Sequence, residues 1–428
     1  MNRKLLVATG LVFLFVIVAL VWYFFYAKPV IAPSLSGTND PLPGNQLPPR
    51  FQFIGNSEDE EGGSVTEVTQ TPEDPLIRVW DKPATGQHFL TEGILLEEMA
   101  TTTQGTTTVE IKRTVRATTT LLLFVDRETG YIYGYSPSDN SVFQISNTIV
   151  SGVHDAYIFN EGKRIIMRYT ENENSGVVGI IATIPSFSPG GTPSPLEGVK
   201  YLNSEVSSVA VSEDGGAASY SVKTEGGSAI YSVSSGEPTF VASSPFSEWD
   251  LSYGGNILYA TTRPSAFAMG VTVVLPSFTT IIGERAALMI KPSSSLLLGS
   301  VWSQGGIASF LASKTSTRQL SLRTLASKCG WGANNFLICA TPKRFPPGSG
   351  YLPDTWFQGS VRFEDSLTEV DVSSLTENEF FSFEEEYGLF DVTNITISED
   401  NNFISFINKR NGELWMIKSA LLPNSQQQ

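Results

Sequence analysis

A short unit recurs along this chain: an apolar strand end, a small polar residue, a turn and a second apolar strand. The unit is found as IFNEGKRIIMR, AVSEDGGAASYS, DLSYGGNILYA, MIKPSSSLLLGS, CGWGANNFLIC and TISEDNNFISFI. The apolar residues before the turns are Phe159, Val211, Leu251, Ile290, Trp331 and Ile397, at intervals of 52, 40, 39, 41 and 66 residues. A propeller blade of four antiparallel strands takes about 40–50 residues, and the longest interval indicates an insertion. The spacing therefore predicts an all-β chain folded as a β-propeller.

The number of blades follows from the rest of the strand pattern. The stretch TLLLFVDRETGYIYGYSPSDNSVFQIS, before the first unit, predicts three more strands and one more blade. This gives seven blades, with six or eight as open alternatives and a pair of β-sandwiches as the main rival fold. Leu76–Trp80 is a candidate outer strand of the last blade, which would close the ring and remove exposed sheet edges.

The turn units resemble the WD40-like (TolB-type) β-propeller repeat, in which Ser-Pro-Asp-Gly joins two apolar strands. VSEDGG and ISEDNN match most closely, at Ser212–Gly215 and Ser398–Asn401, with Glu in place of Pro. The pattern covers residues from about 115 to 420. The resemblance implies a fold and does not imply an activity.

As a whole, the chain is similar to single-pass membrane propellers of candidate-phyla (Patescibacteria) bacteria. The stretches LRTLASKCGWG, LPDTWFQGSVRFEDSL and FINKRNGELWMIK carry this similarity. It implies fold and location, and no activity can be transferred from it.

The N-terminus predicts a membrane anchor. Residues 5–26 carry no charged side chain, and a helix of this length spans roughly 33 Å, enough to cross a bilayer. Arg3 and Lys4 precede the run, which places the N-terminus in the cytoplasm and the propeller outside the cell membrane. The alternative is a cleaved signal peptide, but the bulky end of the run, Trp-Tyr-Phe-Phe-Tyr, does not suit a signal peptidase.

The chain divides into four predicted segments. Residues 1–28 are the flank and anchor, 29–75 a flexible linker rich in proline and acidic residues, 76–422 the propeller and 423–428 a disordered tail. The threonine-rich stretch from Thr101 to Thr108 is expected to be an exposed loop. Thr376–Glu386 is the one candidate for an amphipathic helix in the propeller.

Composition limits the functions that the chain can have. The net charge of −15 and the lack of a basic stripe argue against nucleic acid binding. Cys329 and Cys339 flank a hairpin-like turn that could set them opposite each other, so a structural disulfide is favoured outside the cytoplasm. A register slip of one residue would separate them, and two buried thiols are the alternative.

Catalytic motifs are scarce. The sequence has two histidines, His88 and His154, and no spacing typical of a metal centre, a nucleophile elbow or a phosphate-binding loop. We therefore expect no metal, no cofactor and no catalytic residue. The carboxylates that could form a glycosidase-type site are Glu364, Asp365, Glu369, Asp371 and Glu384–Glu386, for which a solvated edge is the simpler interpretation.

The best candidate for a binding site is a set of long loops. In a propeller, the loops between second and third strands share a face with the connections between blades. The sixth-blade loop 343–358 is stiffened by prolines, and its aromatic residues either bind a partner or fold back over the blade. The predicted binding residues are Phe345, Tyr351, Trp356 and Phe357 in this loop, Arg263 and Phe267 in the fourth blade and Trp302 in the fifth.

Three functions remain open. The first is a membrane-anchored module that binds or scaffolds an unknown protein or envelope polymer. The second is a structural subunit of a larger envelope assembly. The third is a carboxylate-based envelope enzyme, which predicts acidic side chains converging at the central channel with raised pKa values.

Overall fold

The computed structural model describes residues 74–104, 107–170, 176–202, 205–303, 306–313, 315–383 and 387–419, and of residues 92–118 it describes the backbone alone. The predicted anchor at residues 5–26, the linker up to residue 73, Glu384–Glu386 and the tail lie outside the described residues. Across these described ranges, no helix has the length and apolar character needed to cross a membrane.

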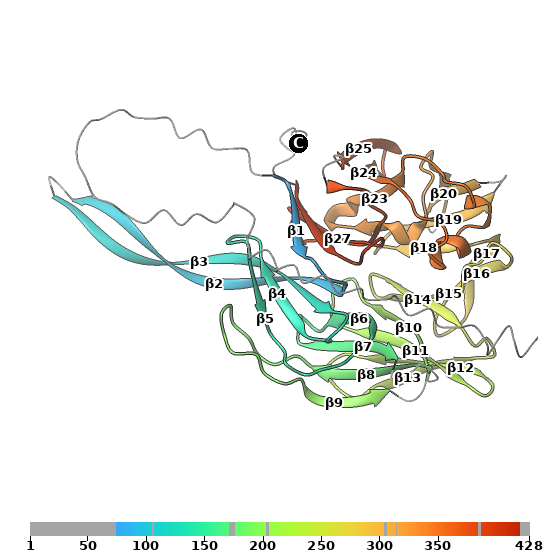
Figure 1. The fold of residues 1–428 in the computed structure, drawn as a ribbon, viewed down its shortest axis with the longest axis horizontal. Coiled ribbons are helices and arrows are strands. Elements are labelled where there is room, and N and C mark those ends of the chain that lie inside the picture. The colour runs from blue at the N-terminus through green and yellow to red at the C-terminus, as the bar shows by residue number, and fades with distance from the viewer. Residues whose placement is uncertain are drawn as a thin grey trace, which may run out of the picture. The chain divides into compact units, whose positions relative to one another are not determined.

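The described chain forms seven four-stranded antiparallel sheets, which are the blades of a β-propeller (Figure 1). Blade 1 consists of β2 (Ala84–Gln104), β3 (Thr107–Asp126), β4 (Ile132–Ser136) and β5 (Ser141–Gln144). Blade 2 consists of β6 (Val153–Phe159), β7 (Arg164–Thr170), β8 (Val177–Thr183) and β9 (Glu197–Leu202). Blade 3 consists of β10 (Val206–Val211), β11 (Ala218–Thr224), β12 (Gly227–Val233) and β13 (Thr239–Ser244).

The remaining blades follow in chain order. Blade 4 consists of β14 (Trp249–Gly254), β15 (Ile257–Thr262), β16 (Met269–Val274) and β17 (Thr279–Ala286). Blade 5 consists of β18 (Met289–Pro292), β19 (Leu297–Ser303), β20 (Gly306–Ala312) and β21 (Thr317–Gln319). Blade 6 consists of β22 (Cys329–Trp331), β23 (Leu337–Pro342), β24 (Asp365–Asp371) and β25 (Thr376–Ser382), and blade 7 of β26 (Val392–Ile397), β27 (Phe403–Asn408), β28 (Leu414–Lys418) and β1 (Leu76–Trp80).

In the part of the chain that the structure describes, the elements of blade 6 are accompanied by four short helical turns. The 3-10 turn η1 (Ala326–Lys328) precedes β22, and η2 (Ala333–Asn335) joins β22 to β23. The loop between β23 and β24 contains η3 (Ser349–Tyr351) and the single α-helical turn α2 (Asp354–Phe357). This loop is the insertion that lengthens the last repeat interval.

The ring is closed by β1, as the sequence predicted. Residues Leu76 to Trp80 pair antiparallel with β28, so the start of the described chain completes the sheet formed by its end. Leu76 and Val79 are buried there. Closure thus gives the last blade its fourth strand, with β1 as the outermost.

A serine stabilises the hairpin turn in the two units that match the repeat most closely. Ser212 accepts a hydrogen bond at Oγ from the amide of Ala217 (2.9 Å) and donates one to Asp214 (2.6 Å). Ser398 does the same with the amide of Phe403 (2.9 Å) and with Asp400 (2.6 Å). Each serine thus satisfies polar groups of the hairpin that would otherwise be buried without partners.

Seven apolar clusters lie between neighbouring blades, one at each interface. Alternation along the strands produces this arrangement: Leu122 and Phe124 pack toward blade 7, whereas Leu123 and Val125 pack toward blade 2. The interface of blades 4 and 5 has the fewest buried members, which are Ile282, Leu288, Phe310 and Ala312.

Two local predictions are wrong. The threonine-rich stretch is not a loop, because β2 and β3 pair from Ala84↔Asp126 as far as Gln104↔Thr107. They continue as a two-stranded ribbon beyond the point where β4 stops pairing with β3 (Figure 1). The candidate helix at Thr376 is the strand β25, because its residues complete the edge of blade 6 by pairing with β24.

Candidate binding face and central channel

The sixth-blade loop and its neighbours form the candidate site. We call the side of the ring that carries the loops between second and third strands and the connections between blades the loop face. Residues 343–364 join β23 to β24 on this face, and residues 263–268 join β15 to β16 of blade 4. Both loops had been singled out from the sequence.

The structure brings together two of the predicted binding residues from different blades. The rings of Phe267 and Tyr351 stack with their centroids 5.5 Å apart and their planes 21° apart. Phe267 is 76% exposed and Tyr351 is 56% exposed. The stack presents apolar surface to solvent. Because the two side chains are already restricted by their mutual contact, they lose little conformational freedom on binding a partner.

A carboxylate fixes this pair. Asp354, at the start of α2, accepts hydrogen bonds from the Oγ of Ser265 (3.0 Å) and the amide of Ala266 (2.6 Å). Blades 4 and 6 are not neighbours in the ring, so this contact carries the sixth-blade loop across to the fourth blade. Nothing in the sequence indicated this role, because the partners are almost ninety residues apart.

The other aromatic residues of the loop differ in exposure. Phe357 is exposed, whereas Phe345 is partly exposed and packs edge-on against buried Phe363, with centroids 5.9 Å apart. The guanidinium of Arg323, from the connection between blades 5 and 6, lies 5.4 Å from the centre of the Phe345 ring. Phe345 is thus positioned by contacts on two sides and keeps one edge in solvent.

Trp356 folds back instead of facing a partner. Its side chain is 2% exposed, and its Nε1 donates a hydrogen bond to Oδ1 of Asp391 (3.0 Å). Lys409 donates from Nζ to the Trp356 carbonyl (2.6 Å) and lies over the indole ring. The sequence left two roles open for these rings, which were binding a partner and folding back over the blade. Trp356 folds back and anchors the loop.

Beneath Trp356 lies a fully buried ionic network. Lys328 Nζ lies 2.6 Å from Oδ1 of Asp391 and 2.8 Å from Oδ2 of Asp365, and all three side chains are shielded from solvent. Asp365 Oδ2 also accepts the amide of Val392 (2.7 Å), which ties blade 6 to blade 7. Burial raises the pKa of Asp365 to about 6, although Lys328 opposes the shift.

The two remaining predicted binding residues lie apart from the aromatic stack. Arg263 is exposed and forms an ion pair with Glu248 (2.8 Å), an exposed pairing that contributes little to stability. Trp302 is half-buried and packs against the cluster between blades 5 and 6. Neither side chain is among the ring contacts of Tyr351 and Phe267.

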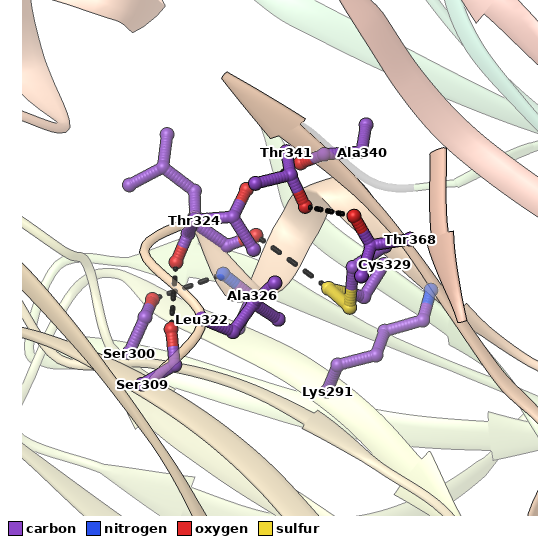
Figure 2. The surroundings of a disulfide bond; sticks show 12 residues. Lys291, Ser300, Ser309, Leu322, Thr324, Ala326, Cys329, Ala340, Thr341 and Thr368 are labelled. Atoms are coloured by element: carbon purple, nitrogen blue, oxygen red, sulfur yellow. Dashed lines mark hydrogen bonds between the residues drawn. A yellow bond between two sulfur atoms is a disulfide. The ribbon is translucent and has the colours of Figure 1, made fainter. Parts of the chain in front are cut away.

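Cys329 and Cys339 form a disulfide directly across β22 and β23 (Figure 2). The turn between them uses Asn334 and Asn335 at positive φ, which sets the register that faces the cysteines toward each other. Around the disulfide, hydroxyl groups hold the incoming connection: Ser300 accepts the amide of Ala326 (2.9 Å) and Ser309 donates to the Thr324 carbonyl (3.1 Å).

The central channel contains charged residues that the sequence did not reveal. Arg168 pairs with Asp155 at 2.8 Å, and both lie close enough to Tyr157 to affect the pKa of its phenol, which burial raises. Asp250 on β14 is reached by solvent and yet surrounded by protein, as expected in a channel, and burial raises its pKa to about 6. Lys291 on β18 lies near Asp250, and burial lowers the pKa of its ammonium group.

The carboxylates considered for catalysis that the structure describes have separate surroundings, and Glu384–Glu386 lie outside the described residues. Asp365 is buried in the ionic network, Glu364 lies 3.4 Å from Arg344, and Asp371 is exposed and accepts the amide of Ser373. Glu369 is half-buried, and burial raises its pKa. Among the residues that the structure describes, no three acidic, histidine or cysteine side chains are grouped as metal ligands.

A groove of about 640 Å³ lies between blades 4 and 5, the interface with the smallest buried apolar cluster. It is lined by Tyr259 and Arg285 of blade 4 and by Val301, Ala308 and Phe310 of blade 5, among others. The small residues of β20 leave this space open.

Comparison with known proteins adds little beyond the fold. No family model and no curated protein matches the chain. Solved structures that resemble it include the β-propeller domain of Myceliophteria thermophila Cps50 (Swd1), with 9% identity, a TM-score of 0.43 and coverage of 70% of this chain and 93% of that one. They also include an oligogalacturonate lyase in complex with manganese, with 9% identity, a TM-score of 0.43 and coverage of 80% and 99%.

A third similar structure is the Pyrococcus horikoshii acylaminoacyl peptidase, with 9% identity and a TM-score of 0.43. The match covers 76% of this chain and 57% of the peptidase chain. At this identity, the likenesses concern the fold alone. The seven four-stranded sheets, and the pairing of β1 with β28 that closes the ring, make this chain a seven-bladed β-propeller.

Proposed function

We propose that this protein is a membrane-anchored, extracytoplasmic binding module whose partner is held on the loop face. The observation that carries the proposal is the exposed stack of Tyr351 on Phe267, which Asp354 fixes across two blades that are not neighbours. Aromatic residues that are exposed and already ordered are typical of the centres of protein–protein interfaces.

The aromatic rings on the loop face have two different roles: some contact the partner and one supports the loop. Tyr351, Phe267 and Phe357 present apolar surface to solvent. Trp356 instead holds the loop from beneath through Asp391. A partner would therefore contact a rigid surface, and little entropy would be lost in ordering the loop on binding.

We also propose that the propeller lies outside the cytoplasm and is held there by a membrane anchor. The apolar run at residues 5–26, with its N-terminal basic flank, supports an anchor with the propeller outside the cytoplasm. The Cys329–Cys339 disulfide agrees with an oxidising compartment. Alkaline phosphatase fused after residue 428 should be active in cells, because the enzyme folds only outside the cytoplasm; an inactive, stably expressed fusion would contradict this topology.

Two other functions have weaker support. A structural subunit of a larger envelope assembly would use the same face but would need a permanent partner. A carboxylate enzyme would need two free acidic groups, whereas in the channel Asp155 is neutralised by Arg168 and Asp250 alone has a raised pKa. The geometry therefore favours binding over hydrolysis.

Crosslinking in intact cells followed by mass spectrometry tests the binding proposal. The double variant Phe267→Ala/Tyr351→Ala should lose a crosslinked partner that the wild-type protein captures. The matched control is Tyr201→Ala/Phe240→Ala, which removes two equally exposed rings from the outer strands of blades 2 and 3. Equal capture by both variants would contradict the proposal, and a large assembly that survives both would favour the structural subunit.

A further inference from the structure

The loop face carries positive charge although the protein as a whole is strongly acidic. Six basic residues lie in or near the sixth-blade loop, three of them within it, one in the connection between blades 5 and 6 and two between β27 and β28, and we call them the basic strip. Its members are Arg323, Lys343, Arg344, Arg362, Lys409 and Arg410. The net charge of the chain is −15, so this grouping is not a consequence of composition.

Three members of the strip, from two different connections, contact residues of the sixth-blade loop. Arg323 lies over Phe345, Lys409 lies 4.8 Å from the centre of the Trp356 ring, and Arg410 donates to the Phe363 carbonyl (2.8 Å). Arg362 is exposed and lies close enough to Lys409 to lower the pKa of that ammonium group, after the larger effect of burial.

The nearby carboxylates that the structure describes are held mainly by other partners, although the charge of Asp391 also opposes the lowering of the Lys409 pKa. Asp365 and Asp391 are buried with Lys328, and Asp354 is directed toward Ser265 and Ala266. Within the described ranges, Arg344 is the only member of the strip with an ion pair, to Glu364 at 3.4 Å. Arg323, Lys343 and Arg362 are exposed cations without an ion pair in the described ranges, and Lys409 and Arg410 are half-buried beside them. Cations grouped in this way create a positive potential that attracts an anionic ligand.

We propose that the partner of the loop face is a protein that presents an acidic peptide segment with aromatic or apolar residues, its carboxylates lying along the basic strip and its apolar side chains on the Tyr351–Phe267 stack. This inference rests on the proposed binding function. Arginine and aromatic side chains are the types enriched in protein–protein interfaces, which favours a peptide over an anionic glycan. Guanidinium groups also bind carboxylates with two hydrogen bonds each.

Binding of a random glutamate–tyrosine copolymer to the purified full-length chain in detergent tests the inference. We expect binding to the wild type that weakens by about tenfold or more as ionic strength rises from ~0.05 M to ~0.3 M, because exposed charges are screened. Lys343→Glu/Arg362→Glu should weaken it by about tenfold or more at low salt. The matched control Lys163→Glu/Lys200→Glu reverses two exposed charges far from the loops and should bind as the wild type does.

The results distinguish failure of the acidic-peptide inference from failure of the proposed binding function. Absence of copolymer binding, or binding that the strip variant leaves unchanged at unaltered thermal stability, would overturn the acidic-peptide inference. Polygalacturonate or single-stranded DNA binding more tightly than the copolymer would overturn it in favour of another anionic polymer. If the cellular partner is lost with Phe267→Ala/Tyr351→Ala but kept with Lys343→Glu/Arg362→Glu, the binding function stands and this inference fails.

Discussion

Nζ of Lys328 lies 2.6 Å from Oδ1 of Asp391, in an interior that solvent does not reach. Lys328 ends the turn before β22, and Asp391 immediately precedes β26, so this ion pair joins the entries of two blades. Asp391 also accepts the indole N–H of Trp356. One buried carboxylate therefore links the framework of the ring to the loop that carries the exposed aromatic rings.

Replacing Lys328 by Met should lower the free energy of unfolding by about 3–5 kcal/mol near neutral pH, because two carboxylates are left buried without their cation. The loss should shrink as the pH falls toward about 6, since burial raises the pKa of Asp365 to about 6 and protonation then removes one of the two buried charges. Urea denaturation measures the change. Lys343→Met, at an exposed lysine of the adjacent loop, should stay within about 0.5 kcal/mol of the wild type; equal stabilities of the two variants would contradict the assigned role.

Asp250→Asn should stabilise the protein at neutral pH and have little effect near pH 4. Burial raises the pKa of Asp250 from 3.8 to about 6 in the folded state. The protonated side chain stabilises the folded state fully at pH values below the pKa that Asp250 has in the unfolded chain. This stabilisation is lost as the pH rises through about 6, the pKa in the folded state. The difference in melting temperature between variant and wild type should therefore grow from pH 4 to pH 6 and then level off. A difference independent of pH would show that Asp250 ionises normally.

The double variant Cys329→Ala/Cys339→Ala should lower the free energy of unfolding by about 2–3 kcal/mol, as expected for a cross-link that closes a short loop. The two residues lie ten positions apart in the sequence. Guanidinium unfolding of the wild type with and without reductant gives the same comparison without mutation. If reduction leaves the midpoint unchanged while the thiols become reactive, the disulfide does not stabilise the ring.

A chain beginning at residue 81 should be far less stable than one beginning at residue 74. The shorter chain lacks β1, so β28 loses one of its two partner strands and the buried contacts of Leu76 and Val79 disappear. Burial of these two side chains alone contributes about 3–6 kcal/mol. Thermal unfolding by circular dichroism compares the two chains directly. Similar melting temperatures would mean that the ring does not depend on this closure.

Ala308→Val should raise the free energy of unfolding by about 1 kcal/mol. The added methyl groups enter the groove between blades 4 and 5, and a branched side chain suits strand β20. Ala326→Val is the matched control, because Ala326 is buried in a filled cluster and the larger side chain should destabilise by about 1–3 kcal/mol. Urea midpoints of the two variants should therefore move in opposite directions.

The sequence alone predicted the β-propeller and its seven blades, with six or eight blades and a pair of β-sandwiches left as alternatives. Two of the turn units stabilise their own hairpins, because Ser212 and Ser398 each donate a hydrogen bond to the aspartate two positions later. The intervals between units fixed the blades, and the apolar run of Leu76–Trp80 identified the closing strand. The long hairpin of β2 and β3 was missed because threonine-rich sequence is typical of both loops and strands.

Only the tertiary structure decided which residues act together. Trp356 and Tyr351 have similar sequence surroundings, yet one is buried on Asp391 and the other is exposed on Phe267. The members of the basic strip, from Arg323 to Arg410, are spread over nearly ninety residues and three connections, so no local pattern could reveal them. Such groupings depend on where a closed ring places distant loops, and ring closure is a property of all seven sheets together.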